Sequence, residues 1–393
     1  MIEIINKRDC CGCSACVQKC PKQCISLKED EEGFLYPVVD KETCIDCGLC
    51  EEVCPVLHQG EERKPLKVYA AKNQNEEIRL QSSSGGVFTL LAEEVIKEGG
   101  VVFGARFDEE WEVKHDFTET MEGLGAFRGS KYVQSRIEDN FQKAEAFLKQ
   151  GLKVLFSGTP CQVAGLKRFL RKEYDNLLTV DFVCHGVPSP GVWRRYLKET
   201  KLNIYKNKRN VDIENISFRD KQTGWKKYCF SLKYSELGVD GEKKTNAYVE
   251  LARNNIYMKG FLADLYLRPS CYACPAKCGK SDSDITIGDL WGAPFILGQD
   301  DDKGTSLVFI NEDISYLKNN LSLWVKEIDY SSVLVYNPSI VHSIKKSVKR
   351  HLFYTKLKKK ESLNSIIDTL SGNNIYYRVI FKLERIVKQF IGR

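Results

Sequence analysis

The sequence lacks the long apolar stretches that define several classes of protein. No run of about 18 apolar residues occurs among its 393 residues, so no transmembrane helix is expected. The first residues, MIEIINKRDCCGC, contain no apolar segment of the kind found in signal peptides. Sixteen cysteines in a chain of this length also do not suggest a secreted disulfide protein. We therefore expect a cytoplasmic protein.

The sequence also lacks the uniform positive charge of a nucleic-acid-binding protein. Its formal net charge is +6, but residues 341–393 contain 13 Lys or Arg and only 3 Asp or Glu. This tail carries +10, and the rest of the chain therefore carries −4. A mildly acidic body argues against nucleic acid as a partner, and against a cluster-bearing regulator that binds it.

Two cysteine runs dominate the N-terminal region. They are Cys10-x2-Cys13-x2-Cys16-x3-Cys20-Pro21 and Cys44-x2-Cys47-x2-Cys50-x3-Cys54-Pro55. Each has the spacing of a bacterial two-cluster ferredoxin, in which the fourth cysteine binds the other cluster. A zinc site or a disulfide scaffold is the alternative, but zinc favours paired C-x2-C ligands without this repeat.

The spacing predicts how these cysteines divide between two 4Fe-4S clusters. The first cluster is expected on Cys10, Cys13, Cys16 and Cys54, and the second on Cys44, Cys47, Cys50 and Cys20. Cys11 and Cys24 lie outside both runs, and we interpret them as small apolar fillers near the clusters.

The chain divides into four predicted parts. Residues 1–58 form the two-cluster ferredoxin domain, and a polar linker leads to an α/β domain at 66–300. Residues 301–340 close that domain, and residues 341–393 form a basic helical tail. The fold class is thus α+β and α/β, with a mixed sheet in the larger domain.

A βαβ unit is predicted within residues 153–183. A strand over 153–157 leads through Gly158-Thr159-Pro160-Cys161 into a helix, and a second strand ends at Cys184. Parallel strands place both cysteines at the same edge of the sheet, where sites usually lie. With the pair Cys271 and Cys274, they could hold a third 4Fe-4S cluster.

Alternatives remain open for this third set. Cys278 competes for the role of fourth ligand, and the C-x2-C pair resembles half of a zinc ribbon. Cys161 is alternatively a buried thiol that caps a helix, or a redox thiol with a lowered pKa.

Two strand-to-helix turns are candidates for binding a flavin. The first is Ser82-Ser83-Ser84-Gly85-Gly86 and the second is Ser157-Gly158-Thr159-Pro160. Glycine and a helix N-terminus suit a phosphate, although a flexible loop with a serine cap gives the same pattern. Lys131, in the segment Phe127-Arg-Gly-Ser-Lys131-Tyr132, offers a cation that could face a diphosphate or a reduced flavin, although a solvated loop is the alternative interpretation. A flavin would also convert one-electron transfer by clusters into two-electron chemistry.

An ordered set of motifs resembles the coenzyme F-420 hydrogenase/dehydrogenase beta-subunit family, in the bacterial branch with a fused N-terminal ferredoxin. The motifs are SSSGGVFTLLAEEVI, RGSKYVQS, FSGTPCQVAGLKRFL, VCHGVPSP, ISFRDKQTGW, CYACPAKC and SDITIGDLWG, within roughly residues 1–300. The resemblance implies a domain that binds FAD next to a 4Fe-4S cluster on Cys161, Cys184, Cys271 and Cys274. Cys278 is not part of the family's usual pattern.

These observations predict an iron–sulfur flavoprotein oxidoreductase. It would relay electrons between a ferredoxin-like or other redox protein and an unknown small-molecule or coenzyme substrate, through the clusters and FAD. The alternative is a non-catalytic electron-transfer subunit of a larger complex. Catalytic candidates are His185, Lys131 and Arg219, while Arg219, Asp220 and Asp289 line a pocket or form a structural ion pair.

The last residues form a predicted basic amphipathic helix. Apolar residues from Tyr376 to Ile391 share one helical face, and Arg and Lys residues lie elsewhere. Such a helix suits peripheral contact with an anionic membrane surface. Packing on its own domain or on a partner is the competing interpretation.

Overall fold

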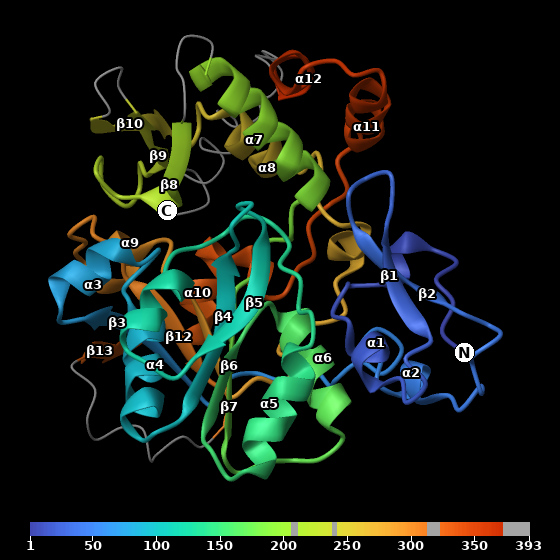
Figure 1. Ribbon diagram of the computed structural model, residues 1–393. Coiled ribbons are helices and arrows are strands. Elements are labelled where there is room, and N and C mark those ends of the chain that lie inside the picture. The colour runs from blue at the N-terminus through green and yellow to red at the C-terminus, as the bar shows by residue number, and fades with distance from the viewer. Residues whose placement is uncertain (206–210, 238–241, 313–322, 372–393) are drawn as a thin grey trace.

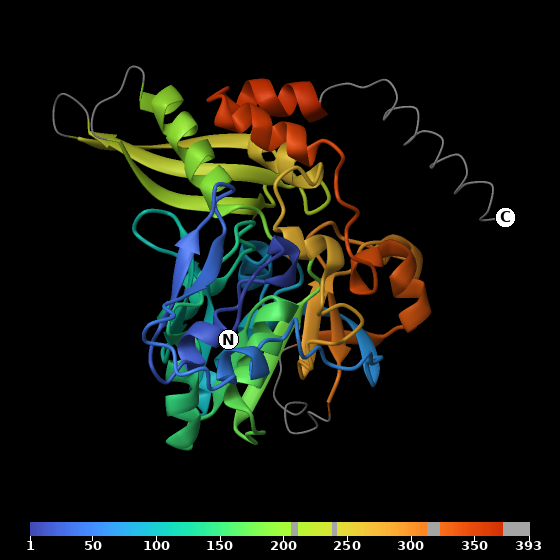
Figure 2. The ribbon, with the colours of Figure 1, turned by 90° about the vertical axis from the view of Figure 1, so that its right-hand side faces the viewer.

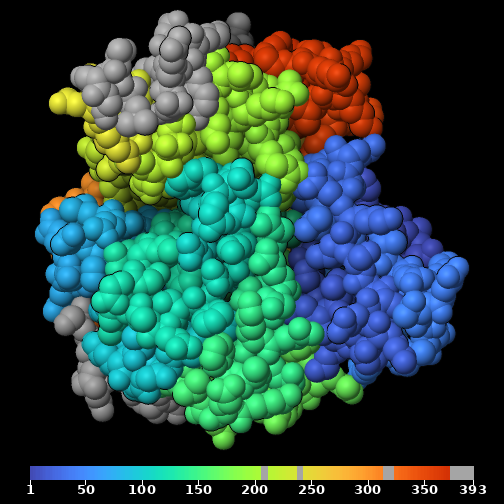
Figure 3. All heavy atoms as spheres, viewed as in Figure 1, coloured from blue at the N-terminus to red at the C-terminus, as the bar shows by residue number. Residues whose placement is uncertain are grey.

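The computed structural model describes residues 1–205, 211–237, 242–312 and 323–371. An N-terminal unit, a large central sheet with helices, and a smaller sheet with helices form three parts (Figure 1). The N-terminal unit projects as a lobe beside the central part (Figure 3). No helix in the described ranges is both long and apolar enough to cross a lipid bilayer.

The N-terminal unit pairs strands β1 (Ile25–Glu29) and β2 (Leu35–Val39) in antiparallel fashion. Gly33, with φ of +83°, forms the turn between them. Helices α1 (Ala15–Lys19) and α2 (Leu49–Glu52) each begin inside one cysteine run. The two runs are thereby folded back on each other, with α1 packed against α2.

Eight strands form the central sheet, and they are β3 Lys67–Asn73, β4 Val101–Phe107, β5 Val113–Thr118, β6 Val154–Ser157, β7 Leu177–Phe182, β11 Ile285–Asp289, β12 Ser306–Ile310 and β13 Leu323–Glu327. Their order is β13-β3-β12-β11-β7-β6-β4-β5. Pairing is parallel from β11 through β7 and β6 to β4, and antiparallel at both margins. This mixed sheet confirms the predicted fold class.

Helices cover both faces of the central sheet. Helix α4 (Val87–Lys97) packs on one face through the apolar positions that the sequence spaces at helical intervals. Helices α5 (Asn140–Lys149) and α6 (Pro160–Leu170) pack on the other face. The N-terminal unit lies on this second layer, because Cys13 contacts α6 at Gly165 and α1 packs on α6.

The smaller sheet is antiparallel, in the order β10-β9-β8, with β8 at Val211–Asp220, β9 at Cys229–Leu237 and β10 at Lys243–Leu251. The helices that pack with it are α7 Pro190–Tyr205, α8 Ile256–Leu262, α11 Arg350–Lys358 and α12 Leu363–Ser371 (Figure 2). Their shared core is rich in aromatic residues, including the buried Trp193, Phe230 and Tyr257.

The remaining helices are short. They are α3 Glu76–Gln81, α9 Ala293–Leu297, α10 Tyr330–Tyr336 and the 3-10 segments Lys7–Asp9, Glu122–Phe127, Pro269–Ala273 and Pro338–Ile340.

The first half of the basic tail packs on the body of the protein. Leu363, Ile366, Ile367 and Leu370 bury the apolar face of α12 in the core of the smaller sheet. The predicted amphipathic helix from Tyr376 to Ile391 lies outside the described residues. The boundary at residue 341 and the membrane contact therefore remain predictions.

Candidate functional site

The first predicted set of ferredoxin cysteines is gathered in the N-terminal unit. Cys13, Cys16 and Cys54 are buried, and Cys10 is half-buried. Burial and, to a smaller extent, the neighbouring thiols of Cys10 and Cys54 raise the pKa of Cys16 to about 12. This set of thiols could bind one cationic group through several thiolates.

The second predicted set lines a small cavity at the far end of the N-terminal unit. Cys20, Cys44, Cys47 and Cys50 all line it, together with Cys24. The sulfur atoms of Cys24 and Cys20 are 3.4 Å apart, so Cys24 lies beside this set, as predicted. Cys47 is exposed, which leaves this end of the unit open to a redox partner.

The arrangement suits a cluster of several irons. Among the described residues, no group of three or more His, Cys, Asp or Glu side chains is placed to hold a single metal ion. A 4Fe-4S cluster instead spreads its thiolate ligands over several irons, so its cysteines need not converge on one point. The thiol-only donor sets above fit such a cluster.

The structure also brings together the third predicted set of cysteines. Cys161 lies in the first turn of α6 after β6, and Cys184 follows the neighbouring strand β7. Cys271 and Cys274 lie in and just after the 3-10 helix Pro269–Ala273. Burial raises the pKa of the Cys184 thiol well above its usual range, and the other three thiols act in the same direction. All four thiols therefore lie close enough to influence one another electrostatically.

Cys278 lies apart from this group. Its thiol donates to the backbone oxygen of Val341 at 3.4 Å. Burial is the main cause that raises the pKa of the Cys278 thiol, and Glu62 is the neighbour whose charge raises it most. This placement of Cys278 favours Cys184 over Cys278 as the fourth ligand.

Contact with Cys11 and burial raise the pKa of Cys161 well above its usual range, which argues against the interpretation of Cys161 as a redox thiol with a lowered pKa.

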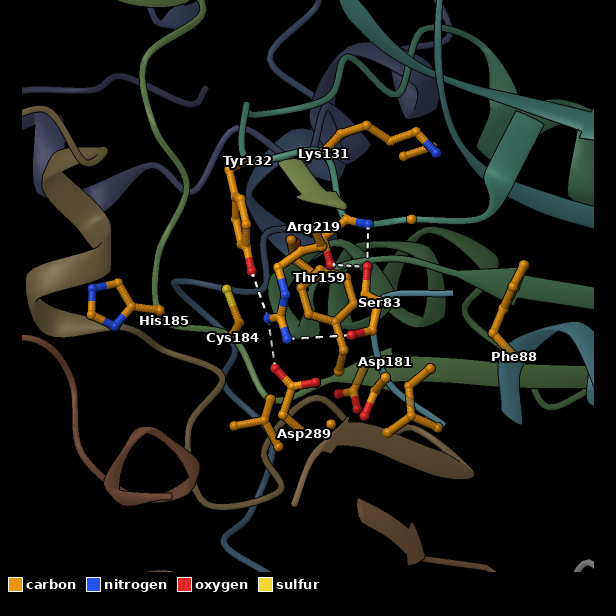
Figure 4. A pocket seen from close by; sticks show the side chains of 18 of the residues that line it. Ser83, Phe88, Lys131, Tyr132, Thr159, Asp181, Cys184, His185, Arg219 and Asp289 are labelled. Atoms are coloured by element: carbon orange, nitrogen blue, oxygen red, sulfur yellow. Dashed lines mark hydrogen bonds and ion pairs between the residues drawn. The ribbon is translucent and has the colours of Figure 1, made fainter. Parts of the chain in front are cut away.

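A cavity of about 500 Å³ opens at the carboxyl edge of the parallel strands. It lies between the central sheet and the smaller sheet, with Arg219 at its centre (Figure 4). Cys184 lines this cavity, so the third cysteine set adjoins it. The volume is within the ordinary range for small-molecule and cofactor sites.

Most of the predicted cofactor-binding residues line the cavity, and these are Ser82, Ser83, Ser84, Gly86, Lys131, Ser157, Gly158 and Thr159. Two of the predicted residues do not line it. Gly85 packs on the sheet, where its N–H donates to Ser306 Oγ at 2.9 Å. Pro160 occupies the first position of α6 instead.

Helices α4 and α6 both begin at the cavity, but they differ in whether their first backbone N–H groups are free to bind a ligand. Thr159 and Gln162 cap α6 reciprocally, so some of its first N–H groups are already satisfied. Helix α4 begins after Gly86, which has φ of +84° and provides no side-chain cap. The free N–H groups and the dipole of α4 therefore make its start the better site for a phosphate.

Two cations line the cavity close to the start of α4. Arg128 donates to Thr89 Oγ1 at 3.2 Å, on the first turn of the helix. Lys131 donates to the backbone oxygens of Ala126 and Arg128 at 2.8 and 2.9 Å. Burial lowers the pKa of Lys131 to about 7, and the charge of Arg106 adds to this effect. An anion bound here would favour the charged form of the lysine.

Arg219 lies at the centre of the cavity wall and is buried. Its guanidinium pairs with Asp289 at 2.8 Å and donates to Tyr132 Oη at 3.2 Å and to the Ser83 backbone oxygen at 3.3 Å (Figure 4). Its Nε has no partner among the described residues. Arg219 and Asp289 thus fit both sequence interpretations, since they line the cavity and form an ion pair. Asp220 does not line the cavity.

His185 lies on the opposite side of the cavity from Phe88 (Figure 4). Its Nε2 lies 2.7 Å from Asp264 Oδ1, and its ring packs edge-on against Phe261. The carboxylate fixes the orientation of the imidazole. Such an arrangement suits either proton transfer or support of the adjacent Cys184 loop.

Two further cavity residues were not predicted from the sequence. His115 on β5 is buried, its Nε2 lies 3.0 Å from the Ser157 oxygen, and burial lowers its pKa to about 4. Asp181 on β7 is buried, and burial raises its pKa to about 6. Asp181 could have been predicted as a site residue, because an aspartate inside an otherwise apolar strand is unusual.

Family models match most of the chain. The N-terminal and C-terminal models of the coenzyme F420 hydrogenase/dehydrogenase beta subunit match residues 68–139 and 151–318. A 4Fe-4S dicluster domain matches residues 9–57, and a 4Fe-4S single cluster domain of ferredoxin I matches residues 39–83. No curated protein matches the sequence.

One solved structure that resembles the chain comes from the F420-reducing [NiFe] hydrogenase complex of Methanosarcina barkeri. The likeness covers 80% of this chain and 94% of that chain, with 18% sequence identity and a TM-score of 0.41. The family matches, which together span more than half of the residues, are the stronger finding. The chain belongs to the coenzyme F420 hydrogenase/dehydrogenase beta-subunit family and carries an N-terminal 4Fe-4S ferredoxin domain.

Proposed function

We propose that this protein is an iron–sulfur flavoprotein oxidoreductase. It exchanges electrons with a ferredoxin-like protein at the N-terminal unit and with a two-electron substrate at the cavity. The observation that carries the proposal is the position of Cys184, which belongs to the third cysteine set and also lines the cavity. One side chain thereby connects a thiol-only metal site with a cofactor-sized space.

Three 4Fe-4S clusters and one FAD fit the residues present. The clusters would be held by the three cysteine sets, and FAD by the start of α4, Ser83, Arg128 and Lys131. Arg219 lines the same cavity. When bound, FAD supplies the exchange between one-electron and two-electron chemistry.

The side chains of the cavity have distinct proposed roles. Arg128 and Lys131 bind the negative charge of a diphosphate, while Arg219 holds the Ser83 loop through its hydrogen bond to that backbone oxygen. The pair His185 and Asp264 is placed to hold or move a proton at the imidazole Nδ1 or Nε2.

Cofactor content tests the proposal most simply. Anaerobically reconstituted protein should contain about twelve irons, because three 4Fe-4S sites are expected. It should also release about one FAD per chain, as expected for one cofactor cavity. Full iron content without any flavin site would contradict the oxidoreductase proposal.

A turnover assay separates the two classes of function. Reduction of a deazaflavin, a nicotinamide or another two-electron acceptor by the isolated chain would support an enzyme. If cofactors are complete but electrons pass only to a partner protein, the chain is an electron-transfer subunit instead.

A further inference from the structure

A buried arginine occupies the junction between the N-terminal unit and the rest of the protein. Arg268 lies three residues before Cys271, and only 1% of it is exposed. Its Nε donates to the Cys10 oxygen at 2.8 Å, and its Nη2 donates to the Leu35 oxygen at 2.9 Å. The same Nη2 lies 3.4 Å from Cys10 Sγ. Arg268 therefore contacts a predicted ligand of the first cluster directly.

The acceptors of Arg268 do not neutralise its charge. They are two backbone oxygens, the side-chain oxygen of Gln134 at 2.9 Å and the Cys10 sulfur. Arg350, at the same junction, is instead paired with the carboxylate of Glu32. A charge buried this deeply ordinarily needs an opposite charge nearby. Thiolates that carry a 4Fe-4S cluster would supply that charge to Arg268.

Arg268 also faces the third cysteine set. The backbone oxygen of Arg268 accepts a hydrogen bond from the Cys271 N–H at 2.9 Å. The thiol of Cys161 contacts that of Cys11. Cys11 in turn contacts the thiol of Cys13. The first and third cysteine sets are therefore neighbours, and Arg268 lies at their junction.

The backbone is shaped to admit the arginine. Gly12, between Cys11 and Cys13, has φ of +76°. A Cβ atom at this position would lie 2.8 Å from Arg268 Nη1 and 2.8 Å from Gln134 Nε2. Gln134 Nε2 also donates to the Cys11 oxygen at 3.0 Å, which fixes the loop against the arginine. Only glycine allows this close approach.

We propose that Arg268 is a positioning residue that raises the reduction potential of the cluster held by Cys10, Cys13, Cys16 and Cys54. An added electron makes a cluster more negative, so the positive charge of a buried arginine beside it stabilises the reduced form. Hydrogen bonds to cluster sulfurs and nearby charge are the known means of tuning such potentials. The inference rests on the proposed function, since it requires clusters at these sites.

An anaerobic redox titration followed by electron paramagnetic resonance tests this inference. The Cys271→Ala background removes the third cluster and leaves the two ferredoxin clusters. Arg268→Gln in that background should lower one potential enough to change the reduction equilibrium at least tenfold, which is about 59 mV for one electron. The potential of the second cluster should stay constant, because Arg268 contacts none of Cys20, Cys44, Cys47 or Cys50.

Three further variants complete the test. Arg268→Lys keeps the charge and should shift the potential less than Arg268→Gln. Arg350→Gln disrupts the same junction without touching a cysteine thiol, and it should leave both potentials unchanged. Gln134→Glu neutralises Arg268 in place and should lower the same potential, and it decides the question if Arg268→Gln loses its cluster.

Two results would overturn the inference in different ways. Unchanged potentials in protein that retains its iron would refute the role of Arg268 alone. A wild-type chain that binds no cluster at the N-terminal cysteines would refute the proposed function itself.

Discussion

At the scale of a single residue, the protonation of Lys131 makes the charge of the cavity depend on pH. Its pKa is lowered to about 7, so the side chain is largely charged below that pH and loses its charge as the pH rises. FAD affinity should therefore rise between pH 8 and pH 6. Lys131→Met should lower affinity about tenfold at pH 6 and flatten the pH dependence, a loss of about 1.4 kcal/mol. Quenching of flavin fluorescence measures both effects, and an unchanged pH profile would argue against the role of Lys131.

Cys11 and Cys24 test the assignment of the ligands. Both are buried beside predicted ligands, but neither belongs to a ferredoxin run. Cys11→Ala and Cys24→Ala should retain all of the iron, whereas Cys10→Ala should lose about four irons of one cluster. Iron and sulfide analysis distinguishes them. Loss of a whole cluster in Cys11→Ala would mean that Cys11 is a ligand.

At the scale of an element, Gly165 allows helix α6 to pack closely against Cys13 of the N-terminal unit. A Cβ atom on Gly165 would lie 2.8 Å from Cys13 Cβ and 3.0 Å from its sulfur. Gly165→Ala should favour the helix by about 1 kcal/mol, yet the contact with Cys13 should cost about 1–3 kcal/mol. We expect net destabilisation, measured by chemical denaturation together with the iron content.

Gly125 provides a matched control for this substitution. A Cβ atom at Gly125 would meet no heavy atom within 4 Å, and its φ is not positive. Gly125→Ala should leave both stability and iron content close to those of the wild type. Equal behaviour of the two variants would show that α6 does not need a glycine at the junction.

The βαβ unit explains why much of the site could be predicted from the sequence. Strands β6 and β7 are adjacent and parallel, so the positions of Cys161 and Cys184 at one edge follow from topology alone. Spacing could not decide between Cys184 and Cys278, because that choice depends on how the loop after Cys274 folds. Arg268 was not predicted, since its partners Cys10 and Gln134 are distant in sequence.

At the scale of the whole molecule, part of the tail at residues 341–393 contributes to the core of the smaller sheet. Deletion of residues 341–393 would remove α11 and α12, which bury apolar residues in the core of the smaller sheet. Deletion of residues 372–393 alone is the cleaner test of membrane contact. It should abolish binding to anionic liposomes at low salt and leave thermal stability unchanged. Equal liposome affinity of the full and shortened chains would refute the prediction.

The whole molecule brings three cysteine sets and one cavity into a continuous series. The exposed Cys47 lies in the second set, Cys11 bridges the first and third sets, and Cys184 adjoins the cavity. Under the proposed function, we expect the third set to connect the ferredoxin unit with the cavity. Cys274 is a suitable ligand to remove, because, unlike Cys184, it does not line the cavity.

The most direct test of this connection is the rate at which bound flavin is reduced by a reduced ferredoxin under anaerobic stopped-flow conditions. Cys274→Ala should retain the two ferredoxin clusters and the flavin. Its flavin should be reduced more slowly than that of the wild type, by on the order of 100-fold. An unchanged rate in a variant that has lost the third cluster would contradict the central claim.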